Sequence, residues 1–596
     1  MRGSAHRRAR GVPVYTPPMP RWRAADAVVE RFGASEVLVA RAGGGPAHLV
    51  SLDDARVLVA CDAFDDDEAH AARIAEEIGL APSEVALALG RLRGLGLLSS
   101  EEEARAAAVA AGQRAEVPPG IAAVGILTRD RPACVARLLD GLERSTRLPL
   151  WICDDSRVDD RRAATRELVS AARRRGADVR LLGGDEKRRL AEALVAAGAA
   201  RELVDLALFD PEGIGYTAGA NRNAFRLVTE GRLSLLIDDD ATTRAARPRD
   251  ARGGIRFTSE DHGVELWFHD SVEAALADRD FEEVDLVALH EQLLGRTLAD
   301  CAARHGAPGL ELDGASPALL ARLTAGTGRV LITQCGYGGD AGISSNASFL
   351  ALRGENRARL AARYTDVRDA RALHRTTGQL LVTEAPYLMG LTTGLDGRHL
   401  LPPWMPFLRN SDGVLAALMR AVHPDGCIGS LPQLVEHRPP EVRRFARDEI
   451  IRGGVALRLS ELTRLVLADW VPPPHGPPED RLDALGRHVA ALGALPPARF
   501  DEVVRALRWE DATRQARDLE LSAAHDDAVA RDAAAALAEL RAAMLDSRAT
   551  AIVDGGDRAQ RLLGRIGELW RGWPAILAAA RRVDLELGET TATSGP

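Results

Sequence analysis

Several features that would narrow the class of this protein are missing from its 596-residue sequence. The six cysteines form no CxxC pair, which argues against a zinc knuckle and a disulfide framework and favours a reducing, cytoplasmic setting. No run approaches the ~18 uninterrupted apolar residues that span a bilayer, so we expect no integral membrane segment. The basic N-terminus is not followed by an apolar core, so we expect no secretory signal either.

Positive charge is not in excess. The chain has 77 Lys and Arg residues against 86 Asp and Glu residues, a formal net charge of −9. Nucleic acid is therefore not an expected partner, because its binding depends on a basic surface. The apolar share of 46% and the charged share of 27% are ordinary for a globular chain. At roughly 100–200 residues per domain, the length suggests three or four domains.

The first part of the chain predicts a short tail and a small module. Residues 1–20 are rich in Arg and Pro, so we expect them to be disordered. Within residues 21–100, two β-rich runs flank the turn Gly43–Gly45 and predict a hairpin, and three helical patterns follow. This order suggests a winged-helix-like α+β domain. Residues 101–119 are charged and predict a linker to the rest of the chain.

Residues 120–440 predict an α/β domain. Short apolar runs alternate with helical patterns, which is typical of a mainly parallel sheet covered on both faces. In such sheets ligands bind beyond the carboxyl ends of the strands. Residues 441–596 are rich in Ala, Leu and Arg at helical spacing, so we expect a helical C-terminal region. This region would form a lid or the surface of a homo-oligomer.

Three of the predicted strands end in polar residues, and one of these endings is unusual. The endings are Thr128–Asp130, Asp154–Asp155 and Asp238–Asp240. Three adjacent carboxylates at the end of a buried strand repel one another unless a cation lies beside them. Carboxylate oxygens suit Mg²⁺ or Mn²⁺, and an ion held by two of them keeps sites open for phosphate oxygens. We therefore expect a metal that bridges a diphosphate and neutralises its charge as it leaves.

The stretches “GILTRDRP”, “WICDDS”, “GANRN” and “LLIDDDA”, in this order, resemble the start of a family 2-type glycosyltransferase with the GT-A fold. The resemblance implies a Rossmann-like nucleotide-diphospho-sugar transferase domain and hexosyl transfer, with a UDP-sugar as the expected donor. It implies that Asp238 and Asp240 of the D-x-D motif bind Mn²⁺ or Mg²⁺ and that Asp239 lies near the ribose or the sugar. The implied nucleotide contacts are Thr128, Arg129, Asp154 or Asp155, Arg222 and Asn223.

Two later residues extend this resemblance. The stretch “PPWMPFLRNSDGVLAAL” is similar to the acceptor-side segment of such enzymes, which implies Asp412 as the general base that accepts a proton from the acceptor. In several GT-A enzymes a late histidine completes the metal shell, and His437 stands where one would. The Gly-rich stretch Thr333–Ser345 predicts a loop that lines the sugar pocket through Asp340. Residues 245–400 exceed the family minimum.

Residues 21–100 resemble PqqD-like domains, which recognise the leader part of ribosomally made peptides. The resemblance rests on “GPAHLVSLDDARVLVACDAF” and “IAEEIGLAPSEVALALGRLRGLGLL”. It implies that a peptide adds as a strand to the small sheet and packs against the third helix. We expect exposed edges at Val37, Val39 and Leu49 to serve this contact, and a ribosomally made peptide to be the acceptor.

Each of these residues also has a structural interpretation. The acidic triplet could be a solvated turn, and Asp154 and Asp155 could cap the next helix. Asp412 could be an N-cap, and a lone histidine such as His437 is more often a core or surface residue.

Three functions stay open. The first is a peptide-modifying glycosyltransferase, and the second is a glycosyltransferase acting on polysaccharide or lipid-linked sugar. The third is a non-catalytic nucleotide-sugar-binding protein. A nucleotidyltransferase is disfavoured, because no Gly-rich phosphate loop with a lysine follows the first strand of the α/β domain.

Overall fold

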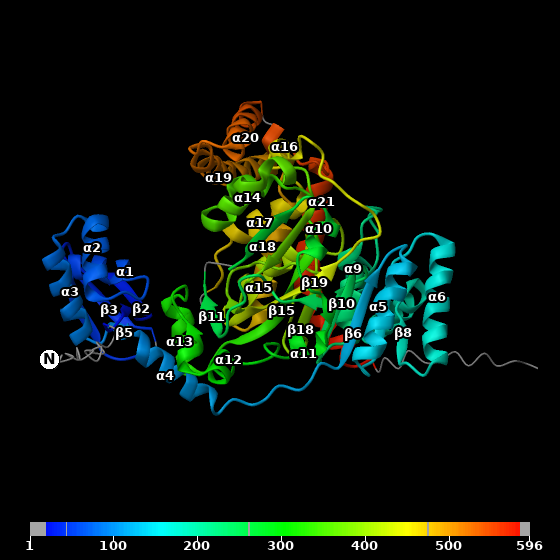
Figure 1. The fold of residues 1–596 in the computed structure, drawn as a ribbon, viewed down its shortest axis with the longest axis horizontal. Helices are drawn as coiled ribbons and strands as arrows, with labels where there is room; N and C mark the ends of the chain where they lie inside the picture. The colour runs from blue at the N-terminus through cyan, green and yellow to red at the C-terminus, as the bar shows by residue number, and fades with distance from the viewer. Residues whose placement is uncertain (1–18, 43, 260–262, 474–475, 547, 584–596) are drawn as a thin grey trace, which may run out of the picture.

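A large mixed β-sheet flanked by helices runs through the body of the molecule, so the chain is α/β (Figure 1). The computed structural model describes residues 19–42, 44–259, 263–473, 476–546 and 548–583. The tail predicted at residues 1–20 lies outside the described residues, apart from Met19 and Pro20. In the part described, no helix combines the length and the apolar character needed to cross a membrane.

The N-terminal module contains the predicted hairpin and helices, and a third strand pairs beside the hairpin. A second small sheet joins the first strand of the module to its last. The middle helix shows why these segments fold as they do, because Asp66 caps its start and Gly79 ends it at φ 75°. The elements are β1 (Trp22–Ala24), β2 (Ala27–Arg31), β3 (Glu36–Arg41), β4 (Ala47–Ser51), α1 (Leu52–Ala60), α2 (Asp67–Ile78), α3 (Pro82–Gly94) and β5 (Leu98–Ser100).

The two faces of β3 are the reverse of what we expected. Val37 and Val39 are 4% and 0% exposed and lie in the module's core, so the prediction that they form an exposed edge was wrong. Leu49 on β4 is exposed, as predicted, and Leu38 opposite it on β3 is exposed in place of Val37 and Val39. Alternating side chains point to opposite faces of a strand. Since β3 is apolar at both sets of positions, its pattern does not tell which face the helices cover.

The predicted linker contains a helix that docks the module on the body. α4 (Glu101–Gly112) packs against α12 (Leu298–His305) and α13 (Pro317–Ala325). A side chain at Gly112 would overlap the backbone of Ala299, so glycine permits this close approach. From the module, the buried Arg23 donates to the carbonyl of Ala315.

The large sheet combines parallel and antiparallel pairs of strands. Ten strands follow one another in the order β14–β11–β17–β19–β15–β18–β9–β6–β7–β8, and four more pair beside this path. The four strands from β9 to β8 are parallel, as predicted, whereas β18 joins β9 antiparallel. These four are β6 (Ala123–Thr128), β7 (Leu150–Asp154), β8 (Val179–Leu181) and β9 (Leu233–Asp238).

Both faces of the parallel part are buried, which explains its continuous apolar runs. Val124 and Ile126 belong to one core cluster with side chains of α5 and α6, whereas Ala123 and Leu127 belong to another with α7, α8 and α9. The helices are α5 (Pro132–Ser145), α6 (Asp159–Arg174), α7 (Gly184–Ala196), α8 (Arg201–Leu208) and α9 (Ala218–Val228).

Residues 241–437 extend the sheet on the far side of β9. The two longest strands, β15 and β19, pair parallel to each other at its centre. The strands are β10 (Ala241–Ala246), β11 (Ile255–Thr258), β12 (Glu265–His269), β13 (Glu282–Glu283), β14 (Leu310–Glu311), β15 (Arg329–Asp340), β16 (Ala372–Thr376), β17 (Leu380–Thr383), β18 (Thr392–Asp396) and β19 (Gly426–His437). Between them lie α10 (Val272–Ala277), α11 (Leu286–His290), α14 (Gly354–Val367) and α15 (Ser411–Val422).

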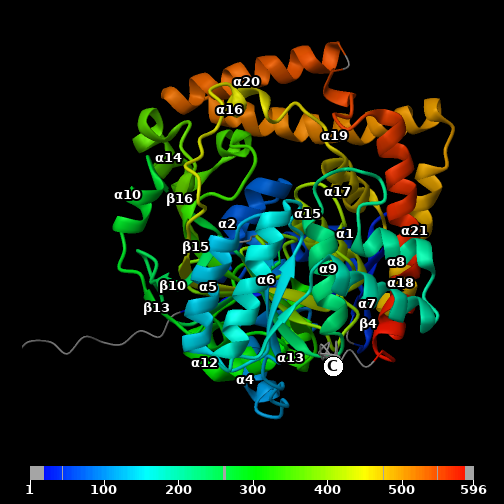
Figure 2. The ribbon, with the colours of Figure 1, turned by 90° about the vertical axis from the view of Figure 1, so that its right-hand side faces the viewer.

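The C-terminal region is helical, as predicted, and forms a roof over one end of the body. Figure 2 shows α19 and α20 lying across the top, with α18 and α21 descending along one side. α18 packs along α21, and α19 packs along α20. The helices are α16 (Glu449–Arg452), α17 (Leu459–Asp469), α18 (Pro478–Gly493), α19 (Pro497–Ala523), α20 (Ala528–Leu545) and α21 (Gly556–Ala580).

Candidate functional site

A cavity of about 840 Å³ lies where β6 and β9 end, beneath the helical roof. Its floor includes the acidic triplet and residues from the start of α9. Its roof comes from α17, α19 and α20, so the C-terminal region takes part in the cavity as a lid would. Three groups of lining residues are Thr128, Arg129 and Arg131 after β6; Asp238, Asp239 and Asp240 after β9; and Glu461, Arg464, Arg508 and Asp511 in the roof.

Each carboxylate of the triplet has a cationic partner, and Asp239 and Asp240 share one. Asp238 accepts from Arg222 at 3.1 Å. Asp239 accepts from Thr128 Oγ1 at 2.7 Å and from Arg131 at 3.3 Å. Arg131 also donates to Asp240 at 3.0 Å. The triplet is therefore not a solvated turn, since Asp239 and Asp240 are buried as well.

The crowding of these carboxylates shifts their pKa values. Burial raises the pKa of Asp238 to about 7, against the opposing charge of Arg222. Burial and the neighbouring charge of Asp240 raise the pKa of Asp239. Burial would also raise the pKa of Asp240, but the charge and hydrogen bond of His437, together with the charges of Arg131 and Arg443, lower that pKa below its usual range.

His437 is oriented as a metal-binding histidine would be. Its Nδ1 lies 2.6 Å from the carbonyl oxygen of Asp340, and a carbonyl only accepts, so Nδ1 carries a proton. Its Nε2 lies 3.2 Å from Asp240 Oδ1. Burial would lower the pKa of His437, but the charges and hydrogen bonds of Asp240 and Asp340 raise it, so the protonated ring donates from Nε2 to Asp240. When that proton is lost, Nε2 presents a lone pair beside the carboxylate, and a backbone carbonyl that fixes the far nitrogen is the usual support of a histidine ligand.

The structure brings Asp412 to the same cavity through Arg222. The buried guanidinium of Arg222 lies 3.1 Å from Asp238 and 3.7 Å from Asp412. Asp412 also accepts from Trp404 Nε1 at 3.2 Å, and its carboxylate lies against Gly390, where a Cβ would come within 2.5 Å. Asp412 follows the N-cap residue Asn410 in the first turn of α15 and is not itself the N-cap. The carboxylate of Asp412 lines the cavity.

The predicted nucleotide contacts fall into two sets. Thr128, Arg129, Asp155 and Arg222 line the cavity. Asp154 does not: it is buried, and it accepts from the backbone of Ser156 at 2.8 Å. The helix that follows, α6, has Val158 as its N-cap residue and no side-chain cap, so the capping role we had weighed for Asp154 was wrong.

Asn223 also lies away from the cavity. Its side chain bonds the backbone of Ala207 and of Trp404 in the core. The residue of that helix turn that does line the cavity is Asn221, which the pattern “GANRN” contains but which we did not single out.

The Gly-rich stretch is mostly strand and not loop. Thr333–Asp340 is the second half of β15, and the Asp340 side chain is fully buried against Arg443 at 2.8 Å, with Arg371 at 3.4 Å. The expectation that Asp340 lines the pocket was wrong, because the short segment after it, Gly342–Ser345, does so instead.

Backbone strain in the described residues gathers around the same cavity. Asp130, Leu408 and Asn410 are the non-glycine residues there with positive φ, at 58°, 70° and 68°. Asp130 follows the lining residue Arg129, and Asn410 lines the cavity itself. Such conformations cost about 1 to 3 kcal/mol each and cluster at functional sites. This observation is independent of the acidic triplet and selects the same place.

Sequence reasoning missed Arg131 and Lys187, and it expected a helical lid without naming any residue of the roof. Lys187 stands on α7, is 3% exposed, and donates to Asp155 at 2.8 Å. A signal for it was present, since lysine occurs once among the 77 Lys and Arg residues. The roof residues carried no such signal, because their contribution depends on how distant helices pack.

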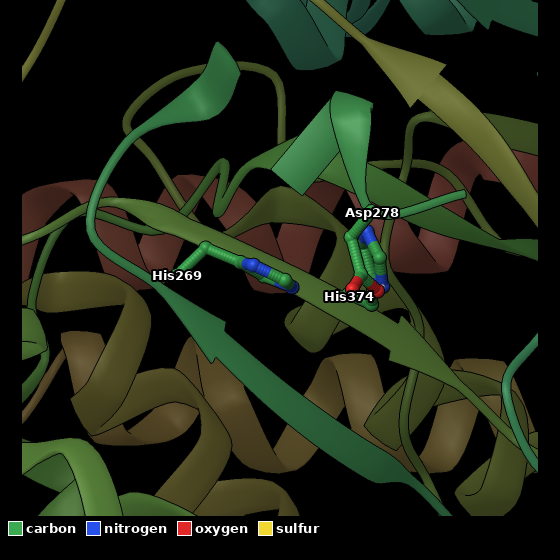
Figure 3. Close-up of side chains that lie close together, drawn as sticks. All are labelled: His269, Asp278 and His374. Carbon is green, nitrogen blue, oxygen red and sulfur yellow. The ribbon is translucent and has the colours of Figure 1, made fainter. Parts of the chain in front are cut away.

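A second cluster of metal-ligand side chains lies elsewhere in the molecule. His269 on β12, His374 on β16 and Asp278 after α10 have ligand atoms within 4.8 Å of one another (Figure 3). Burial lowers the pKa of His269 to about 4. However, Asp278 already accepts from two guanidinium groups, from Arg249 at 2.7 Å and from Arg279 at 3.1 Å.

The charge balance separates the two clusters. Two guanidinium groups face one carboxylate at the His–Asp–His cluster, so a divalent cation would add to an existing positive excess. At the triplet, Arg131, Arg222 and the protonated His437 face the three carboxylates and Asp412, so this cluster has no positive excess. On charge, the triplet is therefore the better candidate for a metal.

The sequence matches no model of a known protein family and no curated protein.

Proposed function

We propose that this protein is a metal-dependent glycosyltransferase that uses a nucleotide-sugar donor, with a GT-A-like domain at residues 120–440. The observation that carries the proposal is the joint placement of the Asp238–Asp240 triplet, His437 and Asp412 around one cavity. A parallel sheet whose strand ends meet a ligand cavity supports a nucleotide-binding domain. The volume of about 840 Å³ is enough for a donor of this class.

The residues of the cavity divide into three roles in this proposal. Asp238, Asp240 and His437 would hold Mn²⁺ or Mg²⁺, which when bound supplies Lewis-acid stabilisation of the departing diphosphate. Arg131 lies beside them as a fixed positive charge for phosphate oxygens.

Asp412 would act on the acceptor. Its carboxylate accepts a proton from the acceptor hydroxyl or thiol as that group attacks the anomeric carbon. The guanidinium of Arg222, 3.7 Å away, holds Asp412 in place. A base on the acceptor side gives inversion at the anomeric carbon.

The test is donor hydrolysis and metal binding by the full chain. A panel of nucleotide sugars with Mn²⁺ or Mg²⁺ is screened for release of the nucleoside diphosphate. We expect the double variant Asp238→Ala and Asp240→Ala to lose turnover by roughly a hundredfold or more, since it removes both carboxylate ligands. Turnover that persists in this variant would refute the metal assignment.

One observation favours a non-catalytic nucleotide-sugar-binding protein as the second candidate. Arg222 pairs with Asp238 and with Asp412, so both the expected ligand and the expected base carry a counter-charge. A carboxylate paired with a guanidinium is a weaker base. Metal-dependent nucleotide binding without donor consumption, across acceptors, would support this candidate over the enzyme.

A peptide acceptor is the part of the proposal that involves the N-terminal module. The sheet β2–β3–β4 has two edge strands, and its outer side exposes Leu38, Leu49 and Val28. An exposed apolar row beside a free strand edge suits strand addition by a peptide.

The acceptor is tested by peptide binding to the full chain. We expect Leu38→Glu together with Leu49→Glu to abolish binding, whereas the same change at exposed Leu521 of α19 leaves it intact. If no peptide binds the wild-type chain, the alternative acceptor, a polysaccharide or a lipid-linked sugar, is favoured.

A further inference from the structure

The His–Asp–His cluster of His269, Asp278 and His374 lies outside the cavity beneath the roof, so the proposed function does not use it. The two histidines belong to the antiparallel strands β12 and β16, where His374 pairs with Trp267 and His269 pairs with Ala372. They are therefore diagonal neighbours on one face of the sheet. Asp278 is the C-cap of α10, which packs against both strands.

The hydrogen bond of His374 shows which of its ring nitrogens can bind a metal. Its Nε2 lies 2.6 Å from the carbonyl oxygen of Ala275, and a carbonyl only accepts, so Nε2 carries a proton. Burial lowers the pKa of this ring, so the ring is neutral at neutral pH and Nδ1 carries a lone pair. This Nδ1 lies 3.7 Å from Oδ2 of Asp278. Two acceptor atoms thus face each other with no proton between them.

His269 adds a ring nitrogen that has no partner. The residue is 6% exposed, and its buried Nε2 makes no hydrogen bond to any of the described residues. Its ring points toward the other two side chains, and the centre of the ring lies 4.5 Å from that of His374 (Figure 3). A buried polar atom without a partner costs free energy. A ligand that accepts the lone pair of this nitrogen would remove that cost.

The three side chains are spaced for one ion. Each offers one ligand atom, and these atoms lie within 4.8 Å of one another. Zinc–ligand bonds of about 2.0–2.2 Å that meet at tetrahedral angles place the ligand atoms about 3.3 to 3.6 Å apart. The distance of 3.7 Å from His374 Nδ1 to Asp278 Oδ2 is close to this spacing, so small side-chain rotations would complete the site. The carbonyl of Ala275 fixes the far nitrogen of His374, which is the usual support of a histidine ligand.

We propose that His269, His374 and Asp278 form a zinc site that fastens α10 to β12 and β16. The inference goes beyond the proposed function and does not depend on it, because it concerns a different part of the molecule. Two ring nitrogens and one carboxylate suit Zn²⁺, whereas Mg²⁺ and Mn²⁺ prefer oxygen ligands. Three protein ligands leave the fourth tetrahedral position to water.

Two arginines limit the affinity of this site. Arg249 donates to both oxygens of Asp278, at 2.7 and 2.9 Å, and Arg279 donates to Oδ2 at 3.1 Å. Their charge weakens the binding of any cation, so the nitrogen ligands must supply most of the affinity. Arg279 also competes with the metal for Oδ2. We therefore expect Arg279→Gln to bind Zn²⁺ several times more tightly than the wild-type chain does.

The first measurement is a calorimetric titration of the full chain with Zn²⁺. The chain carries Asp238→Ala and Asp240→Ala, so that the acidic triplet does not contribute. We expect a single Zn²⁺ to bind, and His269→Gln to weaken it by roughly a hundredfold or more, since even the loss of a group that supports a ligand costs about 10- to 100-fold. His525→Gln replaces an exposed histidine and is the matched control, which should leave the affinity unchanged. If no Zn²⁺ binds, or if His269→Gln binds it as tightly as the control does, the inference is refuted.

The second measurement uses Co²⁺ in place of Zn²⁺ in the same chain, because Co²⁺ absorbs visible light strongly in four-coordinate sites and weakly in octahedral oxygen sites. We expect a strong spectrum that added Zn²⁺ removes and that His374→Gln lacks. Zn²⁺ should also raise the Tm of the parent chain and not that of His374→Gln, since an ion that binds only the folded state stabilises it. A strong Co²⁺ spectrum in His374→Gln would overturn the inference.

The arginine variant keeps the inference testable if the histidine variants do not fold. Zn²⁺ binding that is unchanged or weaker in Arg279→Gln would contradict a site that includes Asp278. The proposed function fails separately from this inference, because turnover of a nucleotide sugar tests the acidic triplet, whereas Zn²⁺ binding is measured in a chain without it.

Discussion

His437 is the residue on which the metal hypothesis depends most directly. Its position is set from one side by the carbonyl of Asp340 and from the other by Asp240. Only the resemblance to GT-A glycosyltransferases pointed to His437. It lies 197 residues after Asp240, and no pattern in its neighbouring residues marks it as a metal ligand. What places it is the pairing of β19 with β15 and β10, which brings His437 opposite Gly339 and Ala241.

The first prediction concerns this histidine. We expect His437→Gln to weaken Mn²⁺ binding by roughly 10- to 100-fold, because a ligand or its close support is lost. Calorimetry or the electron paramagnetic resonance of free Mn²⁺ measures the change. His374→Gln, in the His–Asp–His cluster, is the control and should bind Mn²⁺ as the wild-type chain does. The opposite result would move the metal to that cluster.

The second prediction concerns His290, which is fully buried between Thr333 and Cys335 of β15. Burial lowers its pKa to about 3. Because the unfolded chain takes up this proton near pH 6.5, its stabilising contribution is complete above pH 6.5 and is lost as pH falls toward 3. Denaturation at a series of pH values should show stability falling over this window.

The variant His290→Asn tests this assignment. It removes the titrating group, so we expect a flatter dependence of stability on pH below 6.5. The exposed His525→Asn serves as the control and should keep the wild-type slope. An unchanged slope in His290→Asn would show that other groups cause the acid sensitivity.

At the scale of elements, the parallel strands around the site were predictable from the sequence. The strands of residues 241–437 that extend the sheet beyond β9 were not. β6, β7 and β9 are short apolar runs with polar residues after them, and each was predicted within two residues of its observed bounds. The antiparallel partners β18 and β16 join through pairings that span more than thirty residues, and such pairings leave no mark in local periodicity.

The third prediction concerns how α9 is seated. A Cβ at Gly219 would overlap the carbonyl oxygen of Met405. The glycine therefore lets α9, the helix that carries Arg222, lie close to the loop that precedes α15. We expect Gly219→Ala to destabilise the fold by about 1 to 3 kcal/mol, as overpacking does, and to weaken nucleotide binding. Gly556→Ala in α21 meets no atom within 4 Å and should stay within about 0.5 kcal/mol of wild type in chemical denaturation. Equal stability of the two variants would contradict this explanation.

At the scale of the molecule, the roof is attached to the body by charged contacts between α14 and the C-terminal helices. Arg357 donates to both oxygens of Asp527, at 2.8 and 3.1 Å, just before α20 begins. Arg368 donates to Asp532 at 2.6 Å. A helical region was predictable from its composition. The position of this region over the cavity was not predictable. An amphipathic pattern shows which face of a helix is buried, but it does not show against which surface that face packs.

The fourth prediction tests this attachment. We expect Arg357→Ala to lower stability by about 2 to 3 kcal/mol, because it leaves a partly buried carboxylate without its partner, and to speed hydrogen exchange in α20. Arg541→Ala removes an exposed pair with Glu520 within the roof and should cost at most about 1 kcal/mol. Exchange in α20 that is equally fast in both variants would argue against α14 as the anchor.

The walls of the cavity are spread along the chain from Leu127 to Leu540. During synthesis, the N-terminal module and the four parallel strands are complete long before the roof exists. A nascent or truncated chain that ends before residue 500 would carry the aspartates at the sheet edge with only α17 of the three roof helices that line the cavity. Ligand affinity should therefore arise only in the last stage of translation, and a fragment of the α/β domain alone would not report on the affinity of the whole protein.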